Sequence, residues 1–428
     1  MNHQTAVTAN GRRRAVITGV GIVSPNGIGK EAFWKGLKEA QNCVDKITFF
    51  DASSFPCQVA SEIRQFVPED HISDKSEIKR MGRSAHLGIA AAILAAKDSN
   101  IGLKINRDKT GIIIGSATSG LEYVEPDFRT LERRGVKKVR PYLGIAGFAG
   151  AISSEISRAL KIRGPSLTIS TGCTASTDAM GIALESIRSG NLEVIITGGA
   201  DACVTSGILA AFCQMRAVTF RKSGDPKKAS RPFNKDRDGF VLGEGAWIFV
   251  LEELSHALGR GARIYAELAG YASTCDAWHM AKPHPSGEYT AEALRLAISN
   301  AGLSPQDIDL YSAYGNGTPI NDSYETMVVK KVFGKRAYDL PVVSIKSMLG
   351  HPLGASGAQE VAGIIQAITE GYIHPTTNYE IPDPECDLDY VPNQGRHQKV
   401  KTALCNSIAF GAKNSAVVLR EFSPEAGK

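Results

Sequence analysis

A single cysteine stands between a β-branched run and a run of small residues in the stretch LTISTGCTASTDAMG, residues 167–181. The pattern predicts a strand that ends before Gly172 and a helix that begins near Cys173. The positive end of a helix dipole stabilises a thiolate and lowers its pKa below the usual value of about 8.5. Cys173 is therefore a candidate nucleophile, and a buried cysteine that only fills space is the alternative that its position leaves open.

A histidine occupies the matching place in a second copy of this pattern. The helix after Cys173 closes at Gly190, and the run GHPLGASGAQEVAGIIQAITEG, which begins just before His351, closes in the same way at Gly371. The helix and strand patterns upstream of each copy also repeat. Such a duplication predicts mostly parallel sheets covered by helices, with both loops at one sheet edge. The sequence therefore indicates two related units that share one core.

The composition is that of a folded globular protein and argues against several functional classes. Of 428 residues, 43% are hydrophobic and 22% are charged, and the net charge of +5 is too small and too dispersed for a dedicated nucleic-acid-binding protein. The eight cysteines include no CxxC pair, which gives no sign of a zinc site or disulfide framework and favours a reducing cytoplasm. No apolar segment long enough for a signal peptide follows the basic residues of the first fourteen, and no run of about 18 apolar residues occurs, so we expect neither secretion nor a membrane span.

Four motifs in fixed order carry a resemblance to a known family. GPSLTISTGCTAS, SRPFNKDRDGFVLGEGA, SIKSMLGHPLGASGAQE and NSIAFGAKN resemble the elongating, synthase II-like β-ketoacyl-acyl carrier protein synthases of the thiolase superfamily. The resemblance implies a thiolase-like five-layered αβαβα fold built from two duplicated halves, a dimer, and acyl transfer through a cysteine thioester. We accordingly expect a disordered tail over residues 1–13, an N-terminal half over 14–265 that carries the nucleophile, and a C-terminal half over 266–428 that carries the histidine.

The resemblance also implies roles for individual residues. Cys173 corresponds to the acyl-accepting nucleophile, His351 to the second of two catalytic histidines and Lys346 to the lysine of the site. Phe410 corresponds to a gating phenylalanine whose backbone N–H joins that of Cys173 in the oxyanion hole. Glu325 matches the acidic residue that pairs with the lysine, and we expect it to hold Lys346 in place. No metal or tightly held cofactor is implied.

One position departs from the family pattern. Where the family has A-H-G-T-x-T-P-x-x-D-x-x-E, this chain has AYGNGTPINDSYE, residues 313–325, so the first catalytic histidine is replaced by Tyr314 and a threonine by Asn316. In the family, the two histidines hold the carbonyl oxygen of the malonyl thioester while CO2 leaves. A phenol donates a hydrogen bond but is neither cationic nor basic near neutral pH. Asn316 is a second possible donor if the loop turns it inward.

Three functions follow from this departure. The first is a β-ketoacyl synthase for fatty-acid or polyketide assembly, in which Tyr314 or Asn316 replaces the missing donor. The second is an acyltransferase that keeps the acyl-cysteine step and passes the acyl group to an alcohol, an amine or another carrier. The third is a chain-length-type partner subunit of an active ketosynthase, although a scaffold has no chemical need for a nucleophile.

An acyl carrier protein is the expected partner, beside a homodimer or a heterodimer with a related chain. Carrier proteins of these pathways are acidic, so the mouth of the substrate tunnel needs a cationic rim. Candidates for this rim are Arg133, Arg134, Lys137, Lys138, Arg140, Arg221, Lys222, Lys227 and Lys228.

A separate group of charged residues has the composition of an ion-pair cluster that shapes the cavity wall. These residues are Asp236, Arg237, Asp238 and Glu244.

Overall fold

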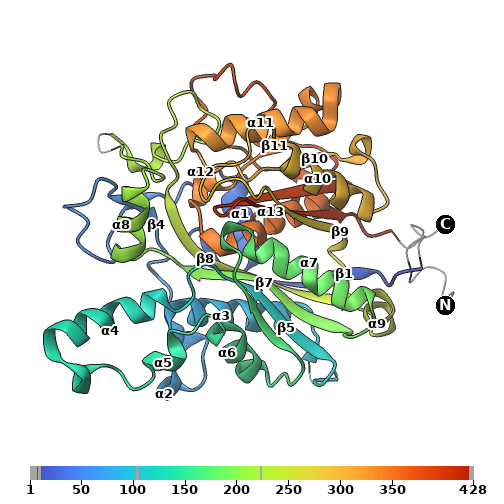
Figure 1. The fold of residues 1–428 in the computed structure, drawn as a ribbon. Helices are drawn as coiled ribbons and strands as arrows, with labels where there is room; N and C mark the ends of the chain where they lie inside the picture. Colours follow the sequence, from blue (N-terminus) through green and yellow to red (C-terminus); the bar gives the residue numbers. More distant parts are fainter. Residues whose placement is uncertain (1–6, 8–10, 103–105, 222–223, 424–428) are drawn as a thin grey trace.

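Strands from both halves of the chain join in one mixed sheet. The computed structural model describes residues 7, 11–102, 106–221 and 224–423. The strand order is β11-β10-β14-β15-β9-β1-β8-β7-β5-β6, with β1 paired to β9 where the two halves meet (Figure 1). The bounds are β1 Ala15–Ser24, β5 Thr110–Gly115, β6 Ser166–Ile169, β7 Val194–Ala202, β8 Leu242–Glu253, β9 Ala266–Cys275, β10 Leu310–Ser312, β11 Val342–Val343, β14 Thr402–Ala409 and β15 Lys413–Arg420.

The N-terminal strands and the C-terminal strands form two layers on opposite sides of α7 (Ala175–Arg188) and α13 (Ser356–Glu370), and the helices form three more, which confirms the five-layered fold. α7 and α13 pack against each other and contact strands of both halves, so they form the central layer (Figure 1). α3 (Arg83–Asp98) and α6 (Ala151–Leu160) cover the N-terminal strands, and α10 (Glu288–Asn300) with α11 (Pro319–Phe333) covers the C-terminal strands. Remaining helices include α1 Lys30–Lys38, α4 Leu121–Arg134, α5 Leu143–Ala146, α8 Ser206–Gln214, α9 Leu254–Gly259 and α12 Lys346–Leu349.

The duplication predicted from the sequence is visible in the order of elements. β1, α3, β5, α7, β7 and β8 of the first half correspond to β9, α10, β10, α13, β14 and β15 of the second. The expectation of mostly parallel sheets was wrong, because β8 runs antiparallel to β7 and β1, and β15 runs antiparallel to β14 and β9. β14 and β15 form a tight hairpin, which forces the antiparallel pairing that a helical crossover would avoid.

Small residues allow the central helices to begin close to the strands. A Cβ atom placed on Gly115 at the end of β5 would lie 2.2 Å from the backbone nitrogen of Ser176 in α7. A Cβ atom on Gly357 in α13 would lie 2.0 Å from the hydroxyl oxygen of Thr177. Only glycine permits such approaches. The starts of α7 and α13 are therefore brought together in the middle of the molecule, where Cys173 and His351 precede them.

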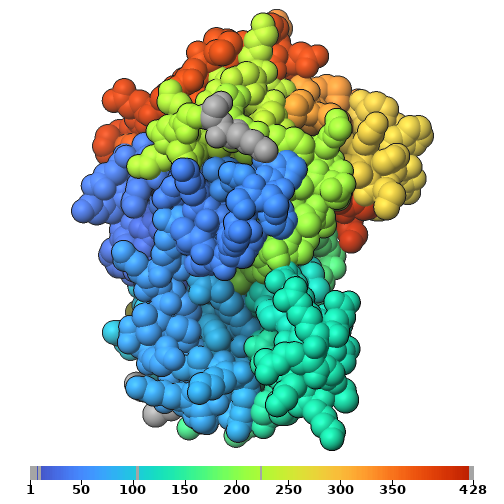
Figure 2. Space-filling model, turned by 90° about the vertical axis from the view of Figure 1, so that its left-hand side faces the viewer, coloured from blue at the N-terminus to red at the C-terminus, as the bar shows by residue number. Residues whose placement is uncertain are grey.

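Part of the expected N-terminal tail lies outside the described residues. Among the tail residues that the structure does describe, Val7 and Arg13 form an isolated antiparallel bridge, and Arg12 forms an ion pair with Glu185 at 3.7 Å. Along the rest of the described chain, no helix is both long and apolar enough to cross a membrane. In the space-filling view, the segment of α4 and α5 forms the lower right part of the face shown, below the chain of residues 206–240 (Figure 2).

A buried carboxylate fixes the junction between the two halves. Glu267 on β9 accepts hydrogen bonds from Arg14, which precedes β1, at 2.6 Å, and from Arg420 at the end of β15 at 2.9 Å. Arg14 and Glu267 are both almost fully buried. Although burial opposes it, hydrogen bonding to the two guanidinium groups lowers the pKa of Glu267. The ion pairs therefore link three neighbouring strands across the junction.

We expect Glu267→Gln to lower the free energy of unfolding by about 3–5 kcal/mol, because it leaves buried guanidinium charge without a carboxylate. Since the folded pKa of Glu267 is lowered from 4.5, its contribution is complete above that pH and is lost as the pH falls through the folded pKa. Urea unfolding measures the change. Asp108→Asn, which breaks the exposed pair with Arg163, is the control and leaves the midpoint unchanged. An equal loss in both variants contradicts the assignment.

Candidate active site

The cysteine sits in a single turn of 3₁₀-helix directly before α7. This turn spans Gly172–Thr174, and its side chain at Cys173 is 5% exposed. Gly172 has φ +76°, a left-handed conformation that favours glycine. The glycine before the cysteine therefore makes the sharp change of direction from β6 into α7 that turns the thiol inward.

Burial, and not the helix terminus, dominates the acidity of this thiol. Desolvation raises the pKa of Cys173 to about 11, while a hydrogen bond with Tyr314 and the positive charge of Lys346 act in the opposite direction. The expectation that the helix dipole lowers this pKa below its usual value was wrong. In this buried site the loss of hydration disfavours the thiolate by more than the Tyr314 hydrogen bond and the Lys346 charge favour it. The resting side chain is the neutral thiol.

Tyr314 and His351 meet beside the cysteine. Tyr314 lies in the loop between β10 and α11, and His351 lies between α12 and α13. The hydroxyl oxygen of Tyr314 lies 3.1 Å from Nε2 of His351, and the two rings are edge-on at 5.4 Å. Burial and the nearby Lys346 lower the pKa of His351 well below its ordinary value, so the imidazole is neutral. The structure thus brings together the nucleophile and both of the residues that the sequence placed at the two histidine positions.

The tautomer of His351 follows from its surroundings. Its Nδ1 atom is buried and has no hydrogen-bond partner among the described residues. A buried N–H without an acceptor costs more than a lone pair without a donor. A proton on Nδ1 would also make the Tyr314 hydroxyl donate to Nε2 and not to Cys173, with which it forms a hydrogen bond. We therefore assign the proton to Nε2, which donates to the Tyr314 hydroxyl oxygen. That hydroxyl is then left to donate its own proton toward Cys173.

Asn316 is turned toward the same hydroxyl. Its side-chain oxygen accepts hydrogen bonds from the backbone N–H and the hydroxyl of Thr318, at 3.0 and 2.8 Å. The amide group is thereby oriented with its donor side toward Tyr314, and its hydrogen bond lowers the pKa of a phenol that burial raises strongly. Asn316 is therefore a second neutral donor beside the tyrosine.

The lysine of the site pairs with a different acid from the one expected. Nζ of Lys346 lies 2.9 Å from Oε1 of Glu360, and both side chains are 1% exposed. Glu325 instead accepts hydrogen bonds from the backbone N–H groups of Tyr314 and Gly315, at 2.9 and 2.8 Å. The predicted Glu325–Lys346 pair was wrong because α11 directs Glu325 at the loop before it, whereas Glu360 on α13 faces α12. Glu325 therefore positions the loop that carries Tyr314.

Phe410 lies beside the turn of the nucleophile. A Cβ atom on Gly172 would lie 3.3 Å from Cβ of Ala409 and 4.0 Å from the carbonyl oxygen of Phe410, so the two loops are in contact. The ring of Phe410 is 37% exposed and stacks on Phe212 of α8 with centroids 6.3 Å apart. This placement suits the expected gate, and the role of its backbone N–H in an oxyanion hole stays a prediction.

A cavity of about 390 Å³ leads to these side chains. Tyr314, Asn316 and Phe410 line it together with apolar side chains and two exposed cations, Arg216 and Lys282. It therefore offers a route from the surface to the donors beside Cys173. Its remaining lining residues are Met215, Ala217, Asp238, Asp276, Ala281, Pro283, Thr318, Pro319, Ile320, Asn321, Ile408, Ala409 and Ala412.

Asp201 is a site residue to which the sequence assigned no role. Its buried carboxylate accepts hydrogen bonds from the Ser116 hydroxyl at 2.6 Å, from the backbone N–H groups of Ala117 and Thr118, and from the N–H of Gly354 at 2.7 Å. It thus ties the loop after β5 to the segment that follows His351. The TGGAD run that ends β7 was the available signal.

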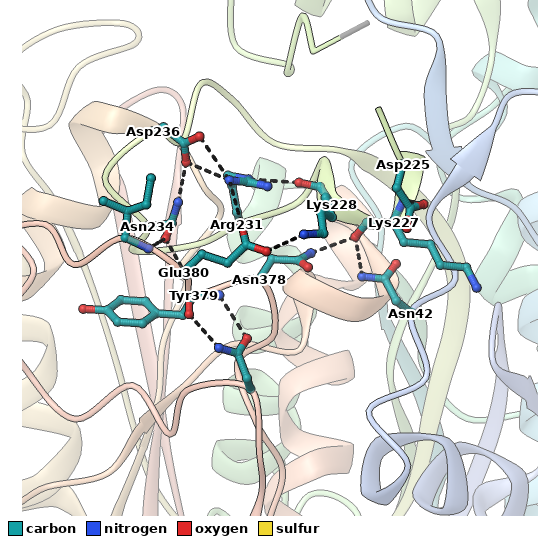
Figure 3. A network of polar contacts seen from close by, with 12 residues as sticks. Asn42, Asp225, Lys227, Lys228, Arg231, Asn234, Asp236, Asn378, Tyr379 and Glu380 are labelled. Atoms are coloured by element: carbon teal, nitrogen blue, oxygen red, sulfur yellow. Dashed lines mark hydrogen bonds and ion pairs between the residues drawn. The ribbon is translucent and has the colours of Figure 1, made fainter. Parts of the chain in front are cut away.

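A network of hydrogen bonds reaches the backbone carbonyl of Lys346. The amide of Asn378 donates to the carbonyls of Lys227 and Ser230, and that of Asn42 donates to the carbonyl of Lys227 (Figure 3). The hydroxyl of Ser230 donates in turn to the carbonyl of Lys346 at 2.6 Å. Hydrogen bonds therefore connect the surface segment around Lys227 to the start of α12.

The structure separates the four charged residues that were expected to shape the cavity wall. Asp238 lines the cavity. The other three are held in ion pairs, which are Asp236 with Arg231 (Figure 3), Arg237 with Asp383, and Glu244 with Arg83. Their contacts are those of structural residues.

The arrangement supplies a soft nucleophile and neutral hydrogen-bond donors. In the described part of the chain, no group of three or more His, Cys, Asp or Glu side chains is placed to hold a metal ion. Tyr314 directs its hydroxyl donor toward Cys173, and His351 and Asn316 direct their donors at the Tyr314 hydroxyl. Such donors stabilise an oxygen that becomes negatively charged in acyl transfer or enolate formation.

Two family models match the chain. "Beta-ketoacyl synthase, N-terminal domain" matches residues 12–257, and "Beta-ketoacyl synthase, C-terminal domain" matches residues 265–380. A relative in Synechocystis sp., named 3-oxoacyl-[acyl-carrier-protein] synthase 2, is 40% identical over 96% of this chain and 99% of its own length.

Solved structures give the same picture. A type II PKS acyl-carrier protein in complex with its ketosynthase bound to the hexaketide includes a chain that is 32% identical, with a TM-score of 0.88. The ishigamide ketosynthase/chain length factor is 35% identical, with a TM-score of 0.89. In both cases the match covers 96% of this chain and 100% of the other.

We expect alkylation of Cys173 by iodoacetamide to rise about tenfold per pH unit between pH 7 and pH 9, because only the thiolate reacts and its pKa is about 11. Tyr314→Phe removes the hydrogen bond that lowers this pKa and so slows alkylation at every pH in that range. Intact-mass spectrometry after timed quenching measures both rates. Tyr324→Phe, at a buried tyrosine bonded to Thr290, is the matched control. A plateau near pH 8 contradicts the assignment.

Proposed function

The chain belongs to the β-ketoacyl synthase family, and we propose that it condenses an acyl group held on Cys173 with a malonyl-carrier thioester in fatty-acid or polyketide-type biosynthesis. The observation that carries the proposal is the hydrogen-bonded Tyr314–His351 pair beside a buried cysteine. The cavity that ends at Tyr314 supports delivery of a thioester to these groups. As a member of this family the chain is an acyltransferase.

In the first step Cys173 accepts the acyl group. Its sulfur forms a bond to the thioester carbon, the bond from that carbon to the carrier sulfur breaks, and the thiol proton leaves with the carrier thiol. Tyr314 favours the thiolate during this exchange, because its hydroxyl already forms a hydrogen bond with the sulfur. The N–H groups of Cys173 and Phe410 are proposed to stabilise the negative oxygen of the tetrahedral intermediate.

In the second step the malonyl thioester loses CO2 and its α carbon forms a bond to the acyl carbon. The bond from that carbon to the sulfur of Cys173 breaks, and the departing thiolate takes up a proton from solvent. The enolate oxygen formed on loss of CO2 needs neutral, preoriented donors. We assign this role to the Tyr314 hydroxyl, held by Nε2–H of His351, and to the Asn316 amide.

The two other functions raised by the sequence receive less support. The named relative is a synthase, one solved neighbour is a ketosynthase with its carrier protein and the other is a ketosynthase/chain length factor. No acyltransferase to an alcohol or amine is among these three. A chain-length-type subunit without catalysis has no use for Cys173, His351 and Lys346 gathered around Tyr314. Decarboxylative condensation is therefore the function that we propose.

We expect incubation with an acyl-carrier thioester to add one acyl mass to the wild-type protein and none to Cys173→Ala. Malonyl-carrier thioester then releases CO2 and gives the β-ketoacyl product. Starting from the acylated enzyme, Tyr314→Phe lowers CO2 release about 10²–10³-fold, because it removes an oxyanion donor. Tyr314→His restores a donor and retains release. Intact-mass analysis with trapping of labelled CO2 measures each step.

Two results contradict parts of this proposal. Acylation of Cys173 without CO2 release overturns decarboxylative condensation in favour of simple acyl transfer. Failure of the wild-type protein to accept any acyl group overturns catalysis and favours a partner subunit.

We propose that an acyl carrier protein docks around Arg216 and Lys282. Both side chains are exposed at the cavity that ends at Tyr314, and Arg216 is held in a left-handed conformation with φ +53° directly after α8. Their charges suit an acidic carrier that delivers its thioester on a flexible arm. The solved complex of a ketosynthase with its acyl-carrier protein supports this class of partner.

Several of the basic residues first considered for this role are engaged elsewhere. Arg140 pairs with Asp127, Arg221 with Asp236 and Lys228 with Glu380 (Figure 3). Lys222 lies outside the described residues. The remaining candidates on or after α4, which are Arg133, Arg134, Lys137 and Lys138, do not line the cavity, and neither does Lys227.

We expect Arg216→Ala/Lys282→Ala to raise KM for an acyl-carrier thioester about tenfold, with kcat unchanged and a weaker dependence on salt. KM for an acyl-pantetheine thioester stays constant, because that substrate has no carrier domain. Lys137→Ala/Lys138→Ala removes the same charge from the other region and is the control. A rise in KM in the control alone moves the docking site to the end of α4.

We also propose association with a second copy or with a related chain. β6 is an edge strand, paired on one side with β5, and its Leu167 is 46% exposed. The exposed Phe128, Ile145 and Phe148 on and after α4 add apolar surface. The solved ketosynthase/chain length factor supports such a pairing. A cytoplasmic location and the absence of a tightly held cofactor stay predictions from the sequence.

A further inference from the structure

A buried aspartate in the first turn of α7 is bonded to the residue before the nucleophile turn. Asp178 is 5% exposed, and its Oδ2 accepts a hydrogen bond from the Thr171 hydroxyl at 2.5 Å. Its Oδ1 accepts another from the Tyr271 hydroxyl at 3.1 Å. We propose that Asp178 is a positioning residue that fixes the turn carrying Cys173 for acyl transfer. This inference rests on the proposed function.

Thr171 transmits this contact to the nucleophile. It precedes Gly172, whose φ of +76° lies in the left-handed region that favours glycine, so no side chain at that position holds the turn in place. The hydroxyl of Thr174, on the other side of Cys173, donates to the carbonyl and hydroxyl oxygens of Thr171 at 3.1 and 3.0 Å. Thr171 and Thr174, which flank the Gly172–Cys173 pair, are therefore hydrogen-bonded to each other, and Thr171 is also hydrogen-bonded to Asp178. The direction of the Cys173 N–H depends on this arrangement.

Tyr271 anchors the aspartate to the other half of the protein. It lies on β9, and its ring packs against α7 so closely that a Cβ atom on Gly181 would lie 2.2 Å from it. Burial and the nearby Asp178 carboxylate raise the pKa of Tyr271, so the phenol keeps the proton that it donates. Its backbone carbonyl is held by the Asn300 amide at 2.9 Å. The turn of the N-terminal half is thus fixed against the sheet of the C-terminal half.

The predicted consequence is kinetic. Asp178, Tyr271 and Thr171 are not among the residues that line the substrate cavity in the described chain. Loss of the contact therefore leaves the binding of a thioester unchanged and misplaces the sulfur and the N–H of Cys173 in the transition state. Such misplacement lowers kcat without raising KM.

The test measures single-turnover acylation of Cys173 by an acyl-pantetheine thioester in the full-length protein. We expect Asp178→Ala to lower the limiting rate about 10–100-fold with KM unchanged, which is the range for a displacement of the reacting group by less than about 1 Å. Asp178→Asn keeps an oxygen acceptor and recovers the rate to within about threefold of the wild type. Thr171→Val and Tyr271→Phe test the same contact if Asp178→Ala fails to fold.

A double-mutant cycle and two matched controls make the test specific. If Asp178 acts through Thr171, the double variant Asp178→Ala/Thr171→Val is no slower than the slower single variant. Thr168→Val removes a hydroxyl on β6, three residues before Thr171, that donates to Ser153, and Tyr324→Phe removes a buried phenol elsewhere, so both keep the wild-type rate. Wild-type kinetics in Asp178→Ala, or additive losses in the double variant, overturn the inference.

The proposed function and this inference fail in different ways. If the wild-type protein accepts no acyl group, the proposed function fails. The contact is then tested by iodoacetamide alkylation of Cys173, where Asp178→Ala and Thr171→Val change the rate by the same factor and Asp178→Asn restores it. Equal alkylation rates in all variants overturn the positioning role independently of any acyl substrate.

Discussion

Burial of the side chains of Cys173, Tyr314 and His351 next to one another is the constraint to which the rest of the site responds. Loss of hydration disfavours charge on each of them, so it raises the pKa of the thiol and of the phenol and lowers that of the imidazole. All three are neutral near pH 7. Reactivity then depends on hydrogen-bond donors that are oriented before the substrate arrives, and the protein must hold those donors rigidly.

Buried carboxylates provide much of this rigidity. Asp201 joins the loop after β5 to the segment after His351, and Glu325 fixes the loop of Tyr314 through two backbone N–H groups. Glu360 holds the Lys346 ammonium group. Each carboxylate binds several donors, which offsets the cost of burying its charge. The loops that carry the reactive groups therefore behave as parts of the helix and strand framework.

The tyrosine changes how the donors are connected. The hydroxyl of Tyr314 lies between the thiol and the imidazole, so in the proposed reaction His351 acts on the reacting oxygen through the phenol. The family pattern has two imidazole donors side by side. In this chain the His351 imidazole and the Tyr314 phenol form a series of two donors, and the Asn316 amide lies beside the phenol. Because a phenol does not take up a proton near neutral pH, the chain works as a set of donors and not as a base.

The sequence by itself determined the duplication, the helices that follow Cys173 and His351, and the identity of the residues at the site, because periodicity, glycine closure and motif spacing are local properties. It did not determine the antiparallel returns of β8 and β15, the raised pKa of Cys173, or the partner of Lys346. Each of these depends on which segments pack together. Desolvation and the choice between Glu325 and Glu360 arise from contacts between residues far apart in the chain, and only the tertiary structure decides them.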